Sequence, residues 1–103
     1  MPWQSIAPKV LKRLYKGRAI DAEGLSPLLS SGIPALVANR KPAHALKTLE
    51  AIASTQGIGM AMRIVPKDDI AALSAALEAL LAAPKQPARA AERVSVLRRQ
   101  LKL

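Results

Sequence analysis

The 103-residue sequence predicts a small, mainly α-helical single domain of about five helices. Three observations support this prediction. Apolar residues recur at helical spacing through most of the chain, half of all residues are hydrophobic, and proline or glycine separates the periodic segments. A chain of this length buries one core without disulfides or metal ions, and it has no cysteine.

The first expected helix covers residues 6–16. Ile6, Val10 and Leu14 recur at four-residue spacing there, and Gly17 ends the pattern. Its cations share the face opposite these apolar residues, so the helix is amphipathic with one strongly basic side.

Two further helices are bounded by proline and glycine. A short helix over about 26–31 starts at Ser26, which is followed by proline, and stops at Gly32. A longer helix starts at Pro42 and carries an apolar stripe as far as its expected terminator, Gly57.

Two short apolar segments, residues 33–39 and 59–65, are left open between strand and helix. Both are short enough for a buried strand, and in the second the alternation of Met60, Met62 and Ile64 slightly favours a strand. If both are strands, the middle of the chain forms an α/β unit with a small parallel sheet. Since two strands make a poor sheet, the mainly α reading is preferred.

The last two helices have clear starts. Pro66 and the carboxylates of Asp68 and Asp69 fit the first turn of a helix that runs to about residue 83. A proline-containing linker, 84–87, then separates it from a terminal basic helix over about 88–102, whose apolar stripe contains Val94, Leu97 and Leu101.

The charge balance indicates an anionic partner. The chain contains sixteen Lys and Arg but only seven Asp and Glu, so its formal charge is +9. A positive charge of this size attracts polyanions. Nucleic acid is the first candidate, and an acidic protein or an anionic membrane surface is the second. The chain has only two aromatic residues, which disfavours proteins that stack bases on rings.

No enzyme chemistry is indicated, so we predict no catalytic residue, metal ion or cofactor. His44 is the only histidine, and the sequence around it shows no recognisable catalytic-triad context. Asp68 and Asp69 do not form a metal-binding pair, because adjacent residues on a helix point about 100° apart and their carboxylates cannot readily converge on one ion. The glycines near residue 57 complete no phosphate-binding motif and are expected to end a helix.

The basic helices are the predicted interface. Their Lys and Arg contact phosphates without reading bases, because phosphate contacts position a protein on nucleic acid and carry no sequence information. A helix-turn-helix over residues 25–41 is a weaker hypothesis, since its base-reading positions hold Ile33, Pro34 and Ala35, which offer no hydrogen-bonding side chain. The predicted contacts are Lys9, Lys12, Arg13, Lys16, Arg18, Arg40, Lys41, Arg89, Arg93, Arg98, Arg99 and Lys102.

Residues 23–83 also resemble part of a known enzyme family. A Glu-Gly segment, the Gly-Ile-Pro of residues 32–34, a Val-Pro turn and an Ala/Leu-rich helix follow one another here. In this order they resemble the carboxy-terminal half of glycosyltransferases with two facing Rossmann-like domains. The resemblance implies an α/β fold and a nucleotide-sugar contact through Glu23, Gly24 and Ser26. It does not extend to an acceptor-binding domain.

Three functions therefore remain open. The first is a non-enzymatic, cytoplasmic nucleic-acid-binding protein, regulatory or architectural, that grips phosphates. The second is a protein-interaction module, an adaptor or inhibitor whose amphipathic helices dock on an acidic partner or on a second copy. The third is a fragment resembling the nucleotide-sugar-binding half of a glycosyltransferase. No stretch is long and apolar enough for a membrane span.

Overall fold

The computed structural model describes residues 22–103, and this part of the chain is helical with no strand in it. The mainly α prediction is therefore confirmed. In chain order the elements are α2 (Ala22–Pro27), the π-helical turn η2 (Leu28–Gly32), α3 (Ile33–Ala38), α4 (Pro42–Ala53), α5 (Ile58–Ile64), α6 (Lys67–Leu81) and α7 (Ala90–Leu101). The helix expected over residues 6–16 lies outside the described residues.

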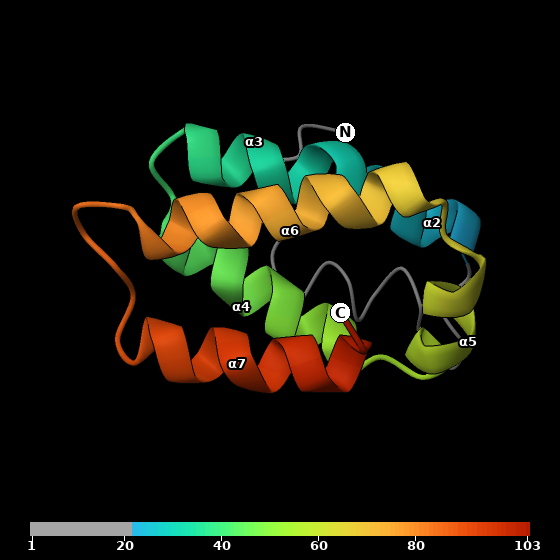
Figure 1. Cartoon of the computed structure of the whole chain (residues 1–103). Helices are drawn as coiled ribbons and strands as arrows, with labels where there is room; N and C mark the ends of the chain where they lie inside the picture. Colours follow the sequence, from blue (N-terminus) through green and yellow to red (C-terminus); the bar gives the residue numbers. More distant parts are fainter. Residues whose placement is uncertain (1–21) are drawn as a thin grey trace.

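The helices form three layers in Figure 1. The run α2–η2–α3 lies beside α6 and forms one layer with it, α4 crosses beneath them, and α7 packs along α4 on the far side. The short helix α5 closes one end by contacting α2 and α7. The turns α3–α4 and α6–α7 lie together at the opposite end, on the left of Figure 1.

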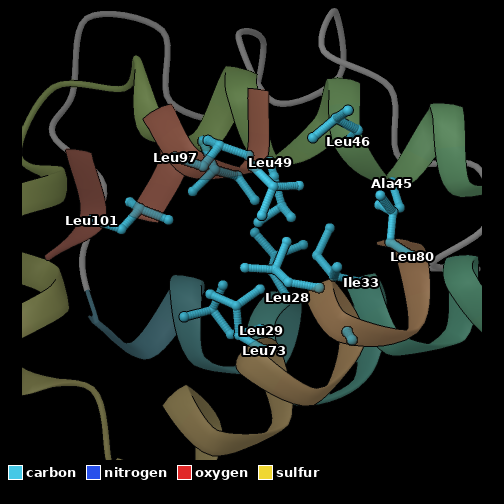
Figure 2. Close-up of a cluster of buried hydrophobic side chains, with 14 of the residues drawn as sticks. Leu28, Leu29, Ile33, Ala45, Leu46, Leu49, Leu73, Leu80, Leu97 and Leu101 are labelled. Carbon is cyan, nitrogen blue, oxygen red and sulfur yellow. The ribbon is translucent and has the colours of Figure 1, made fainter. Parts of the chain in front are cut away.

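One hydrophobic core joins the layers. Leu29 and Ile33 meet Leu73 of α6 from one side, and Leu49 and Leu97 close the core from α4 and α7 (Figure 2). All five are at most 1% exposed. Because the side chains are leucine or isoleucine at helical spacing, their burial out of water is the main stabilising contribution.

Both segments left open between strand and helix are helical. Residues 33–39 include α3, and residues 59–65 include most of α5, so the α/β alternative is wrong for the described residues. In α3, Ile33 and Leu36 are buried on one side, as a three-residue helical period requires. In α5, Met60 and Ile64 are instead exposed, 67% and 69%, while Ala61 is buried. The period-two alternation there does not mark a buried strand face.

The helix expected to stop at Gly32 continues through it. Gly32 has right-handed helical dihedrals, φ −62° and ψ −56°, and is buried. The Ile33 amide donates to the Leu28 carbonyl, which makes the turn wider than an α-turn. Pro34 has no amide hydrogen and its ring crowds the preceding turn. The wider π-turn gives that ring room, so the chain remains helical from residue 22 to residue 38.

Side chains end α4 earlier than Gly57. The Ser54 hydroxyl donates to the Glu50 carbonyl at 2.9 Å, and that of Thr55 donates to the Ala51 carbonyl at 2.8 Å. Such bonds compete with the next helical turn. The chain then reverses at Gly57, whose φ of 83° lies in the left-handed region that glycine favours.

The two clearest helix predictions are confirmed within two residues at each end. Helix α6 begins at Lys67 after Pro66, and α7 ends at Leu101. Asp69 in the first turn of α6 also accepts a hydrogen bond from the Ser26 hydroxyl of α2. The carboxylate therefore joins two helices as well as complementing the helix dipole.

Candidate nucleic-acid interface

Seven of the predicted phosphate-binding cations lie in the described part of the chain. They occupy the α3–α4 turn, helix α7 and the two residues that flank α7: Arg40, Lys41, Arg89, Arg93, Arg98, Arg99 and Lys102. The other five, Lys9, Lys12, Arg13, Lys16 and Arg18, lie outside the described residues.

Arg40 follows α3 in a left-handed conformation. Its φ is 59°, its amide donates to the Val37 carbonyl at 3.1 Å, and the Lys41 amide donates to the Leu36 carbonyl at 2.9 Å. This pair of bonds defines a Schellman motif, which satisfies carbonyls that α3 leaves unpaired. Glycine is the usual residue at the left-handed position, because it has no Cβ. Here that position holds an exposed arginine.

Helix α7 ends in the same way. Lys102 has φ 56°, its amide donates to the Arg99 carbonyl, and the Leu103 amide donates to the Arg98 carbonyl at 2.9 Å. A lysine thus holds the second left-handed position. Arg98, Arg99 and Lys102 also lie near the negative end of the α7 dipole, which favours cations. None of the three forms an ion pair within residues 22–103.

Arg93 is committed to an ion pair that binds α7 to α4. Its Nε donates to Glu50 Oε2 at 3.0 Å, Nη2 bonds the other carboxylate oxygen, and Nη1 donates to the Ala88 carbonyl at 3.1 Å. The hydrogen bond from Arg93 lowers the pKa of Glu50, with its charge and that of Lys47 assisting, while burial opposes the shift. The same hydrogen bond raises the pKa of Arg93. A bidentate arginine–carboxylate pair leaves Arg93 little capacity for a phosphate.

Arg89 precedes α7 and holds a third left-handed position, with φ 56°. Its Nε donates to Glu92 Oε2 at 2.9 Å. Both side chains are more than half exposed, so water screens the pair and it stabilises α7 little. Across residues 22–103, each left-handed residue other than glycine is therefore a lysine or an arginine.

The described cations form two groups instead of one continuous face. Arg40, Lys41 and Arg89 belong to the end of the molecule on the left of Figure 1, whereas Arg98 to Lys102 lie at the other end of α7. Since a helix rises about 1.5 Å per residue, the nine residues from Arg89 to Arg98 separate the groups by about 14 Å along α7.

The structure adds one cation that the sequence did not indicate. Lys85 lies in the α6–α7 linker, and it borders the same groove as Arg40. Their sequence separation exceeds forty residues, so only the packing of α3 on α6 reveals the pair. The long-range partner of Arg93 was missed for the same reason.

The weaker candidates have structural positions. The His44 carbonyl accepts a hydrogen bond from Thr48, and the residue is half-buried on α4. Glu23, Gly24 and Ser26, implicated by the glycosyltransferase resemblance, lie on α2. The Rossmann-like strands that this resemblance implies are absent from residues 22–103, so its fold expectation is wrong there.

Comparison of the chain with protein-family models, with curated proteins and with solved structures finds no match. Among the described helices, none has the length and apolar character needed to cross a bilayer.

Proposed function

We propose that the protein is a non-enzymatic, cytoplasmic nucleic-acid-binding protein, regulatory or architectural, that contacts phosphates. The observation that carries the proposal is the occupation of left-handed positions by Arg40, Arg89 and Lys102. Glycine would relieve backbone strain at each position. A long cation at these exposed sites is therefore less favourable for the backbone than glycine, and phosphate binding would supply a compensating benefit.

The charge distribution supports the same proposal. The chain carries +9, and in its described part Arg98, Arg99 and Lys102 have no acidic partner. Arg40 and Lys41 are likewise exposed and outside any ion pair of residues 22–103. Arg93 is removed from the predicted contacts, because its guanidinium holds Glu50. We expect backbone contact with little base readout, since no aromatic platform is available.

The test is a salt series of binding to fluorescently labelled duplex DNA, single-stranded DNA and RNA, measured by anisotropy. Phosphate binding predicts a linear fall of log K with log salt, with a slope of about −0.9 per neutralised phosphate on duplex DNA. A uniformly acidic protein serves as competitor. Absence of salt-dependent binding near physiological salt, or equal displacement by the acidic protein, would overturn the proposal.

Matched variants test the assigned surface. Replacing Arg98, Arg99 and Lys102 by glutamine should reduce the salt slope by about three, one for each lost contact, and weaken binding on unrelated sequences alike. Reversing the charge of Lys12, Arg13 and Lys16 tests the amino-terminal group.

A control variant removes the same positive charge from cations outside the predicted interface. It carries glutamine at Lys47, Arg63 and Lys67. An equal loss of affinity in this control would show that net charge alone matters, and it would refute the assignment of residues.

A further inference from the structure

A groove of about 1100 Å³ lies between α3 and α6, outside the surfaces assigned above to phosphate binding except at one end. Its walls are mainly apolar and its side chains are small. Pro34 and Val37 line one side, and Ala72, Ala76, Ala79 and Ala83 line the other. Its volume lies slightly above the range of about 300–1,000 Å³ that is typical of small-molecule pockets.

The groove exists because α6 has two apolar faces of different size. Leucines on one face, such as Leu73 and Leu77, fill the core and are at most 1% exposed. The groove face carries alanines at spacings of three and four residues, so no long side chain of α6 fills the space beside α3. From Ala72 to Ala79 the alanines extend about 10 Å along α6, or two helical turns, and Ala83 continues the lining past the end of the helix. Small residues of this kind let another helix approach closely, within about 8 Å between axes.

The charges of the groove are confined to one end. Arg40 and Lys85 line it beside the carboxyl end of α6, and no residue among those lining it carries a carboxylate. The α3 side is also fixed in shape by the π-turn before it, since Ser30 of η2 and Pro34 both line the groove. The groove is therefore apolar along α6 and cationic at one end.

We propose that this groove binds one amphipathic α-helix of a partner protein, with apolar residues against the alanines and acidic residues at the end that faces Arg40 and Lys85. In helix-in-groove recognition the bound helix carries apolar anchors at spacings of three, four and seven residues. Here these anchors would pack against the alanines of α6, which recur at spacings of three and four residues. A second copy of this chain is a poorer occupant, because it brings +9 toward two cations. A nucleic-acid backbone is also a poorer occupant, because apart from Arg40 and Lys85 the walls of the groove offer its phosphates no cation.

The test uses a synthetic helical peptide of about 14 residues, about 21 Å long and therefore long enough to span the alanines of the groove. Its leucines share one face at spacings of three and four residues, and its glutamates are placed at either the amino or the carboxyl end in two versions. Two control peptides have the same leucines scrambled between faces or every glutamate replaced by glutamine. Binding is followed by isothermal calorimetry and by amide chemical shifts of the whole chain.

One substitution blocks the groove and a matched one does not. Ala79→Arg places a long side chain in the groove, whereas Ala71→Arg makes the same change at another exposed position of α6 that does not line it. Arginine is a good helix former, so both variants should fold. We expect Ala79→Arg to weaken the binding of the acidic peptide at least about tenfold, as blocking the centre of an interface does. Ala71→Arg should leave the affinity for the peptide unchanged.

The outcomes separate this proposal from phosphate binding. Ala79→Arg should bind labelled DNA or RNA no more weakly than the unmodified protein, because it removes no cation. Equal binding of the scrambled peptide, equal affinity of the two arginine variants, or shifts confined to residues outside the groove would each overturn the proposal. Dimerisation that Ala79→Arg abolishes would assign the groove to a second copy instead, and it would also overturn it.

Discussion

Arg40→Gly should stabilise the protein even though it removes a side chain and a charge. At φ 59° in the Schellman motif after α3, an L-residue is strained by about 1–2 kcal/mol, and glycine is not. Glycine also gives the unfolded chain more freedom, which takes back about 0.4–1 kcal/mol. The substitution also removes the attraction between the arginine and the end of the α3 dipole, which lowers the gain by about a few tenths of a kcal/mol. We expect a net gain of about 0.5 kcal/mol.

Thermal unfolding followed by circular dichroism measures this gain. For a domain of this size, about 0.5 kcal/mol raises Tm by about 2–4 °C. Arg40→Ala is the control, since it removes the same charge and keeps a Cβ at the left-handed position. The glycine variant should melt above the unmodified protein and the alanine variant should not. If the two variants melted at the same temperature, the left-handed backbone at Arg40 would carry no strain, and the support it gives to the functional proposal would disappear.

Three further predictions concern the stability of the fold. Leu49→Ala should lower the free energy of unfolding in urea by about 2–5 kcal/mol, because Leu49 is fully buried, whereas Val96→Ala, at a 38% exposed position, should lower it by less than about 0.5 kcal/mol. Arg93 lowers the pKa of Glu50 in the folded protein below its value in the unfolded chain. The ion pair therefore stabilises the protein at pH values above the unfolded-state pKa of Glu50, and this stabilisation is lost as the pH falls through the folded-state pKa. Urea titrations should therefore show that Glu50→Gln is less stable than the unmodified protein at pH 7, by no more than about 1 kcal/mol because the Glu50 side chain is 40% exposed. The difference in stability should vanish in acid, and a difference that stayed constant with pH would contradict this prediction. Ser26→Ala should cost about 1 kcal/mol by losing its hydrogen bond to α6, and calorimetric melts with an unchanged Tm would show that the bond is not maintained.

The sequence predicted those helices whose local signals and packing agree. Helices α6 and α7 combine a clear start with apolar residues at helical spacing, and Leu77 and Leu97 are buried as that spacing requires. The failures occurred where tertiary packing overrides a local signal. Gly32 is a common helix terminator, but burying the leucines before it and Ile33 after it keeps the chain helical. Period-two alternation in α5 indicated a strand, and the exposure of Met60 shows that no sheet face was being specified.

The candidate interface was predictable only as a list of cations. Composition and charge indicate which residues can contact phosphate, since positive charge attracts polyanions whatever the fold. They do not indicate which cations are already occupied. Arg93 is paired with a residue 43 positions away, and Arg40 and Lys85 line the same groove only because α3 packs on α6. The left-handed conformations of the basic residues were also invisible, because a lysine or arginine carries no sequence signal for positive φ.

Helix α7 is an outer layer, and this position has a consequence for the energetics of opening. It packs principally on α4 and is joined to α6 by a segment containing two prolines, so it can separate while the leucines of α2–α6 stay in contact. Such a sub-global opening would expose its amides to hydrogen exchange before those of α6. A polyanion that contacted both α7 and the α3–α4 turn, as we propose, would bind only the closed form. Its concentration would then set how often the layer opens, since a ligand that selects one state stabilises that state by mass action.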